Sequence, residues 1–291
     1  MATKTDPKLS ALHAGSVKVG NFIINRLGFG AMRITGAGIW GPPSDTENAK
    51  RVLERAVELD VNFIDTADAY GPNVSEELIH DALAPYEGLL IATKGGLIRG
   101  GPGDWRPSGS PAHLRQACED SLKRLGVDKI NLYQFHRPDP AVRFTDSVKT
   151  LVELREEGKI RHIGLSNVDL QQLRAALEIT PIVSVQNHYN FEHRRDSEAV
   201  LDFCERHHIA FIPYFPIGGG QSDYNQQIIQ DVARKHQANA RQIALAWLLA
   251  RSKCMLPIPG TSSIAHLEEN IASANIKLSA ADMAALDKLS D

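Results

Sequence analysis

Short hydrophobic runs recur along the chain at intervals that suit buried β-strands. Eight such runs lie at residues 26–30, 62–66, 88–93, 130–135, 161–165, 182–186, 209–214 and 254–258. Between them, apolar residues are spaced for one face of a helix at 44–60, 111–125, 146–157, 169–178, 196–207 and 225–250. We expect the last of these segments to split into two helices. Ser44 and Glu47 stand in capping-box register at the start of the first.

Continuous apolar strands that alternate with amphipathic helices predict a parallel sheet covered by helices. Eight such units in 291 residues fit a single α/β domain, residues 1–291, folded as a (β/α)8 TIM barrel. A doubly wound sheet is the alternative, but the sequence LGFGAM lacks the G-x-G-x-x-G fingerprint ahead of a helix. Two apolar runs around Gly20 and Asn21 predict an N-terminal β-hairpin that closes the bottom of the barrel. We expect residues 1–15 to form a flexible tail.

Composition and charge narrow the class of protein. Lys and Arg total 32 against 35 Asp and Glu, a net charge of −3, which argues against nucleic acid as a partner. The N-terminus lacks the apolar core of a signal peptide and no long apolar run occurs, so we expect a cytoplasmic protein without a membrane span. Cys118, Cys204 and Cys254 are scattered, which predicts reduced thiols and no metal site.

Four polar side chains fall where predicted strands end. Asp65 closes the second strand, Tyr70 follows it, Lys94 closes the third and His136 closes the fourth. In a barrel these ends meet at one rim, where the active sites of such folds lie. An ammonium beside a phenol favours its ionised form and so eases proton release, an aspartate keeps that ammonium charged, and a histidine can orient a carbonyl oxygen. Together they predict proton donation to a carbonyl oxygen as hydride reaches its carbon.

Each of the four residues also has an ordinary explanation when it is taken singly. Asp65 fits a strand-end or helix-cap carboxylate, Lys94 a salt-bridge partner, His136 a loop histidine and Tyr70 simple packing. Only the combination at successive strand ends points to chemistry. A metal-dependent barrel hydrolase is a rival interpretation, but the sequence contains no H-x-H pair of the kind such enzymes use.

The motifs FIDTADAYG, IATKGG, LYQFHRPD, IGLSN and IPGTSSIAHLEEN together resemble those of the aldo-keto reductase superfamily, in order and over residues 16–290. The resemblance implies a (β/α)8 barrel that binds NAD(P)H without a Rossmann domain and reduces an aldehyde or ketone reversibly. It implies that Tyr70 is the general acid, that Lys94 and Asp65 adjust its acidity, and that His136 orients the substrate. A redox-silent regulatory protein that keeps the barrel and its nucleotide site is the alternative.

The resemblance also implies a set of cofactor-binding residues. Ser166, Asn167 and Gln186 match residues that hold the nicotinamide carboxamide, and Tyr214 matches the aromatic residue that stacks on the ring. The remaining positions are Gly30, Ala31, Met32 and Asp65 at early strand ends, Gly260, Thr261 and Ser262 for phosphate, and His266, Glu269 and Asn270 toward the adenosine.

The sequence departs from the pattern at the phosphate-binding motif. Relatives that prefer NADPH usually carry Lys or Arg early in this motif and Arg where this chain has His266, whereas Ser263 and His266 stand here. Such a site pairs less strongly with a 2′-phosphate than a guanidinium does. We therefore expect NADP by family default, with NAD left open.

Substrate selection is expected in loops. Trp40 and Trp105 lie in Gly- and Pro-rich segments after strands and predict an apolar wall of the substrate pocket. The expected partner is a small carbonyl compound or alcohol, and we expect a monomer or weak oligomer. The sequence does not identify the physiological substrate.

Overall fold

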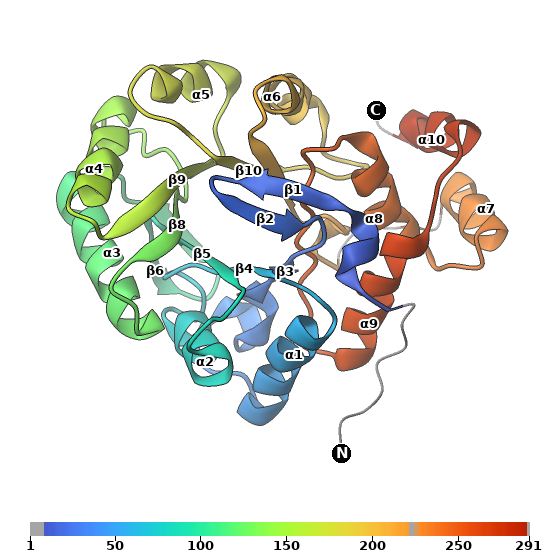
Figure 1. The fold of residues 1–291 in the computed structure, drawn as a ribbon, viewed down its shortest axis with the longest axis horizontal. Coiled ribbons are helices and arrows are strands. Elements are labelled where there is room, and N and C mark those ends of the chain that lie inside the picture. Colours follow the sequence, from blue (N-terminus) through green and yellow to red (C-terminus); the bar gives the residue numbers. More distant parts are fainter. Residues whose placement is uncertain (1–8, 221–223, 225, 290–291) are drawn as a thin grey trace.

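Seven parallel strands curve into one sheet, each strand hydrogen-bonded to the next (Figure 1). The computed structural model describes residues 9–220, 224 and 226–289. Along the sheet the strands are β3 (Phe29–Gly30), β4 (Phe63–Asp65), β5 (Leu90–Gly95), β8 (Ile130–Phe135), β9 (Ile160–Ser166), β10 (Ser184–His188) and β11 (Ala210–Tyr214). All six residues of β5 are buried, as expected for a strand covered on both faces.

The last predicted strand, residues 254–258, occupies the gap between β11 and β3. The Phe211 N–H donates to the Cys254 carbonyl over 2.9 Å, and the Gly28 N–H donates to the Pro257 carbonyl over 2.9 Å. Pro257 and Pro259 cannot donate a backbone hydrogen bond, so this segment pairs too sparsely to form a regular strand. The predicted (β/α)8 barrel is confirmed, with its eighth position filled by an irregular extended segment.

Helices surround the sheet (Figure 1). They are α1 (Thr46–Glu58), α2 (Val74–Leu83), α3 (Pro111–Leu125), α4 (Phe144–Glu156), α5 (Leu170–Leu177), α6 (Arg195–Arg206), α7 (Gln227–Lys235), α8 (Ala240–Arg251), α9 (Ile264–Ala272) and α10 (Ala280–Leu286). The predicted split of 225–250 into two helices is confirmed. Helix α3 begins at the predicted residue because Ser110 accepts from the His113 N–H and Pro111 occupies the first helical position, and it ends at a left-handed Gly126.

A hairpin of β1 (Ser16–Val19) and β2 (Phe22–Asn25) lies across one end of the ring of strands (Figure 1). Val19 and Ile24 are buried there and pack inside the barrel with Phe63 and Leu90, the first residues of β4 and β5. The hairpin therefore covers the N-terminal ends of the strands, as predicted. The opposite ends remain available for a site.

Local expectations differ from the structure at several points. Residues 1–8 of the expected tail lie outside the described residues, whereas Ala11–Ala14 form a short 3-10 helix with Ala11 and Ala14 buried. The N-cap of α1 is Asp45, which accepts from the Asn48 N–H, so the predicted capping box of Ser44 and Glu47 is wrong. The expected loop around Trp105 is a second hairpin, β6 (Leu97–Gly101) and β7 (Asp104–Pro107). Helices α2 and α10 were not predicted.

Asp68 lies in the loop after β4, beside an ion pair of buried Glu76 and partly buried Arg124 whose O–N distance is 2.6 Å. The Oδ1 atom of Asp68 and the hydroxyl of Tyr133 are buried, and neither has a hydrogen-bond partner among the described residues. Burial, and then the charge of Glu76, raise the pKa of Asp68 well above its ordinary value. Asp68 therefore keeps its proton to a higher pH than an exposed aspartate does.

We expect Asp68→Asn to become more stable relative to the parent protein as pH rises from about 5 to 8. In the parent, Asp68 loses its proton at a lower pH in the unfolded chain than in the folded protein. The free energy of unfolding therefore falls as pH rises from the unfolded pKa toward the folded pKa, by up to about 1.4 kcal/mol per pH unit. Asn carries no such proton. Urea unfolding of both proteins at several pH values measures the difference in their free energies of unfolding, which is the gap expected to change with pH. A gap that does not change with pH would show that Asp68 is ionised in the folded protein.

Gly260 tests the closure of the barrel. A Cβ on Gly260 would lie 2.2 Å from the Gly30 carbonyl oxygen, because the last extended segment passes close to β3. We expect Gly260→Ala to cost about 1–3 kcal/mol in unfolding free energy. Gly101→Ala is the matched control, since a Cβ there meets nothing within 4 Å. Equal unfolding midpoints for the two variants would contradict this close contact.

Candidate active site

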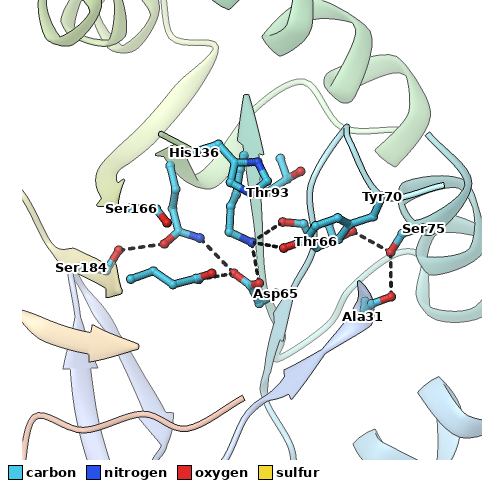
Figure 2. Close-up of polar contacts among 12 residues, drawn as sticks. Ala31, Asp65, Thr66, Tyr70, Ser75, Thr93, His136, Ser166 and Ser184 are labelled. Carbon is cyan, nitrogen blue, oxygen red and sulfur yellow. Dashed lines mark hydrogen bonds and ion pairs between the residues drawn. The ribbon is translucent and has the colours of Figure 1, made fainter. Parts of the chain in front are cut away.

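A buried ion pair holds the centre of the site. The Lys94 Nζ atom donates to Asp65 Oδ2 over 2.6 Å, to the Thr66 carbonyl over 2.9 Å and to the Tyr70 hydroxyl over 3.2 Å. The side chains of Lys94 and Asp65 are 0% and 2% exposed, so solvent does not screen them. Figure 2 shows Asp65 and Tyr70 reaching this point from β4 and the loop after it. The structure thus brings together the three residues that the sequence predicted to meet.

Opposing effects set the pKa values of Lys94 and Tyr70. Burial lowers the pKa of the Lys94 ammonium, but the charge of Asp65 and its hydrogen bond outweigh this, and the net pKa is raised. Burial raises the pKa of the Tyr70 phenol, and the nearby ammonium offsets this only in part. Lys94 thus acts on the phenol in the direction expected from the sequence, but the effect of burial on the pKa of Tyr70 is larger. Tyr70 is a neutral phenol that carries a proton to give.

His136 lies across from the phenol. Its ring meets the Tyr70 ring edge to face, with centroids 5.9 Å apart. Burial lowers the pKa of His136 well below its ordinary value, and the charges of Lys94 and Arg137 lower it further. The imidazole is therefore neutral and offers one N–H donor. Its Nδ1 atom is buried without a hydrogen-bond partner among the described residues.

Two amides hold the other oxygen of the aspartate. The Nε2 atoms of Gln134 and Gln186 donate to Asp65 Oδ1 over 3.0 and 2.8 Å. Both glutamines are buried, and with Lys94 they leave the carboxylate fully engaged. Gln134 was missed in the sequence, although it stands near the end of β8, two residues before His136.

A cavity of about 870 Å³ opens at the C-terminal ends of the strands. It extends from Tyr70 and His136 to the first turns of α9. The predicted residues that line it are Gly30, Met32, Asp65, Tyr70, Trp105, His136, Ser166, Asn167, Gln186, Tyr214, Gly260, Thr261, Ser262, His266, Glu269 and Asn270. Lys94 lies behind Tyr70, where it contacts the phenol rather than the cavity.

Besides Lys94, two predicted residues do not line this cavity. Ala31 is fully buried, and its carbonyl instead accepts from the Ser75 hydroxyl over 3.3 Å (Figure 2). Trp40 pairs with Gly71 through the backbone, and its ring lies 5.6 Å from the Arg99 guanidinium. Trp40 is therefore not among the residues that line the cavity, whereas Trp105 is.

The strand ends on one side of the cavity form an ordered polar network. Asn167 has a left-handed backbone with φ of 58°, which turns the chain sharply after β9. Its side-chain amide donates to the His136 carbonyl over 2.9 Å and accepts from the Tyr214 hydroxyl over 2.8 Å. The Tyr214 ring stacks on His188, with centroids 5.1 Å apart and an interplanar angle of 9°. Tyr214 is thus held as a fixed, flat surface.

The far end of the cavity lies at the start of α9. Ser263 caps this helix, since its hydroxyl accepts from the His266 N–H over 3.4 Å. Two arginines that lie outside the motifs found in the sequence, Arg33 and Arg241, also line the cavity. No motif marks them, because one follows the short β3 and the other lies in the first turn of α8.

The cavity suits a nicotinamide dinucleotide. It provides a flat aromatic ring and amide groups near the neutral His136, and it offers guanidinium and hydroxyl groups at the other end, where phosphates are favoured. Its volume falls in the range of about 300–1,000 Å³ that is typical of ligand sites.

Alternative kinds of site find no support within the described residues. Across residues 9–220, 224 and 226–289, no cluster of three or more His, Cys, Asp or Glu side chains is arranged to hold a metal ion. Cys118, Cys204 and Cys254 are buried free thiols. No helix in this part of the chain is long and apolar enough to span a membrane.

Comparison with known proteins identifies the family. The profile described as "Aldo/keto reductase family" matches residues 26–291. An uncharacterized oxidoreductase of Schizosaccharomyces pombe is 49% identical over 98% of this chain and 93% of its own. Pyridoxine 4-dehydrogenase of Escherichia coli is 42% identical over 96% of this chain and 99% of its own.

A solved structure shares the architecture. The aldo-keto reductase of Klebsiella pneumoniae in complex with NADPH superposes with a TM-score of 0.78 at 25% identity, and 94% of each chain is covered. With the family profile over nearly the whole chain and relatives of high identity over their full lengths, the assignment follows: this protein is an oxidoreductase of the aldo/keto reductase family.

Proposed function

We propose that the protein reduces an aldehyde or ketone to an alcohol, reversibly, with NADPH as the hydride donor and Tyr70 as the general acid. The observation that carries this proposal is the 3.2 Å contact between Tyr70 and a Lys94 ammonium that is itself 2.6 Å from Asp65. Bound NADPH supplies the hydride that adds to the carbonyl carbon. The protein's own residues bind and orient the carbonyl and provide the proton.

Proton transfer follows from the charges around the phenol. A carbonyl oxygen becomes strongly basic as hydride reaches its carbon, and the Tyr70 hydroxyl then donates its proton. The phenolate that remains is stabilised by the Lys94 ammonium. Neutral His136 donates its single N–H to the same oxygen, which fixes the carbonyl against Tyr70. In the reverse direction the phenolate accepts the proton of the alcohol.

Cofactor binding is assigned to the long cavity. Ser166, Asn167 and Gln186 would hold the carboxamide, and the Tyr214 ring would support the nicotinamide. Gly260, Thr261 and Ser262 would contact phosphate. The relative from Klebsiella pneumoniae is described in complex with NADPH, which supports a nicotinamide cofactor for this chain as well.

A preference for NADPH over NADH is the finer part of this proposal. His266 and Ser262 line the adenosine end of the cavity, and Arg241 adds a permanent positive charge there. An Arg241 guanidinium offsets the weaker pairing expected of His266 with a 2′-phosphate. Parallel titrations of NADPH and NADH, followed by protein fluorescence, test this preference.

The experiment that tests the activity follows NADPH absorbance with a panel of carbonyl compounds. The panel includes pyridoxal, because the relative from Escherichia coli is named a pyridoxine 4-dehydrogenase. The reverse reaction with NADP⁺ and the corresponding alcohols completes the set. No turnover with any member, in either direction, would contradict the proposal.

We expect Tyr70→Phe to lower kcat by about 10²- to 10⁴-fold, because it removes the proton donor. NADPH binding, measured by fluorescence, should remain near that of the parent. Tyr86→Phe is the matched control, since its hydroxyl donates to the Leu125 carbonyl at a different place in the fold. Equal losses of turnover and cofactor binding in Tyr70→Phe would assign Tyr70 a structural role instead.

Lys94→Met should lose turnover to a similar degree and also lower the free energy of unfolding by about 3–5 kcal/mol, because it leaves the buried Asp65 charge unpaired. The double variant Asp65→Asn with Lys94→Met removes both charges. We expect it to recover much of the stability but none of the turnover. Recovery of turnover in the double variant would show that the ammonium is not needed for the chemistry.

A further inference from the structure

Arg99 lies in the β6–β7 hairpin with its guanidinium against the face of an indole. The Cζ atom of Arg99 is 3.5 Å from the Trp105 ring centroid and 5.6 Å from that of Trp40. The first distance is that of a guanidinium stacked on an aromatic face. Arg99 thus connects the two tryptophans, although only Trp105 lines the cavity.

The guanidinium also binds three separate backbone segments. Its Nη1 atom donates to the carbonyls of Ile39 and Ala69 over 3.1 and 3.0 Å. Its Nη2 atom donates to Gly38 and Gly101 over 3.3 and 3.4 Å, and its Nε atom donates to Asp104 over 3.0 Å. A guanidinium has five N–H donors, and these contacts engage all of them. The Arg99 guanidinium is therefore fully occupied by hydrogen bonds to backbone carbonyls of the protein itself.

These contacts determine where the pocket wall stands relative to the proposed acid. The Trp105 ring meets the Tyr70 ring edge to face, with centroids 6.4 Å apart and an angle of 77°. Leu97 and Ile39 line the same part of the cavity. Arg99 binds the hairpin, the loop of Gly38 and Ile39, and the carbonyl of Ala69, which precedes Tyr70. Loss of Arg99 would therefore remove the contacts that hold Trp105 at a fixed position relative to Tyr70.

We propose that Arg99 is a positioning residue that fixes Trp105 as the wall of the substrate pocket, and that the substrate is an aromatic aldehyde or ketone whose ring packs on this wall. The inference rests on the proposed carbonyl reduction and adds the class of substrate to it. An aromatic ring that packs against Trp105, beside the Tyr70 and His136 rings, is stabilised by edge and face contacts that a short aliphatic chain does not make.

The test compares Arg99→Met with Arg106→Met, using 4-methoxybenzaldehyde and propanal as substrates. Arg106 lies on the same hairpin and pairs with Asp104 at the surface, so its removal matches the change in charge. For Arg99→Met we expect KM for the aromatic aldehyde to rise about tenfold, the equivalent of roughly 1.4 kcal/mol of lost binding, with kcat within about threefold. For propanal we expect kcat/KM within about threefold of the parent, and Arg106→Met should behave as the parent with both substrates.

Two further measurements report on the wall itself. Removing the stacked guanidinium should increase quenching of tryptophan fluorescence by acrylamide in Arg99→Met but not in Arg106→Met. The dissociation constant of NADPH should stay the same in both variants. Arg99→Lys keeps the charge without the planar fork, so we expect it to resemble Arg99→Met. If Arg99→Met does not fold, Arg99→Lys and Trp105→Leu carry the same expected split between the two substrates.

Some outcomes would overturn the proposal. Equal losses with both aldehydes, a loss in kcat alone, or the same effect in Arg106→Met would each mean that Arg99 does not position a selective wall. If the parent protein turns over neither these aldehydes nor any other member of the carbonyl and alcohol panel, the proposed function fails while the wall is still tested. Saturation-transfer NMR with benzyl alcohol and 1-propanol then decides: a preference for benzyl alcohol that Arg99→Met loses supports the wall, and no preference overturns it.

Discussion

The buried ion pair of Lys94 and Asp65 is the interaction on which the site depends. A charged amine with no exposure to solvent is stable only beside an opposite charge, and the carboxylate in turn needs donors for both of its oxygens. Lys94, Gln134 and Gln186 supply them from three different strands. This requirement fixes the register of β4, β5, β8 and β10 at their C-terminal ends. The phenol of Tyr70 is then placed by the same ammonium that the carboxylate holds.

Closure of the barrel shapes the rest of the cavity. The segment 254–258 completes the ring with few hydrogen bonds, because its prolines carry no N–H. It passes so near β3 that Gly30 and Gly260 have no room for a side chain. The close approach brings the start of α9 near β3, the first strand of the barrel. The cavity therefore runs without a break from the strand ends to this helix. A regular eighth strand with larger residues would separate these two surfaces.

Much of this arrangement was predictable from the sequence because it depends on local periodicity and on strand ends. The barrel strands, the helix α3 and the meeting of Asp65, Tyr70 and Lys94 follow from apolar runs and from the geometry of parallel strands. Helix α2 was missed because two of its four buried residues, Ser75 and Glu76, are polar, which weakens the apolar period of the buried face. The β6–β7 hairpin was missed because its glycines and prolines are typical of loops. The contacts of Arg99 join segments about sixty residues apart, and no local pattern encodes them.

The raised pKa of Tyr70 changes how the site must work. Lys94 does not make the phenol an acid that ionises at neutral pH, because burial of the phenolate outweighs the attraction of the ammonium. The ammonium instead prevents burial from making proton release prohibitive. In the proposed reduction, such a phenol would keep its proton until hydride arrives and would give it up only when the carbonyl oxygen becomes the stronger base. On this proposal, selectivity for the transition state would arise from the balance between burial of the phenol and the charge of Lys94, and both follow from the depth of the Lys94–Asp65 pair within the barrel.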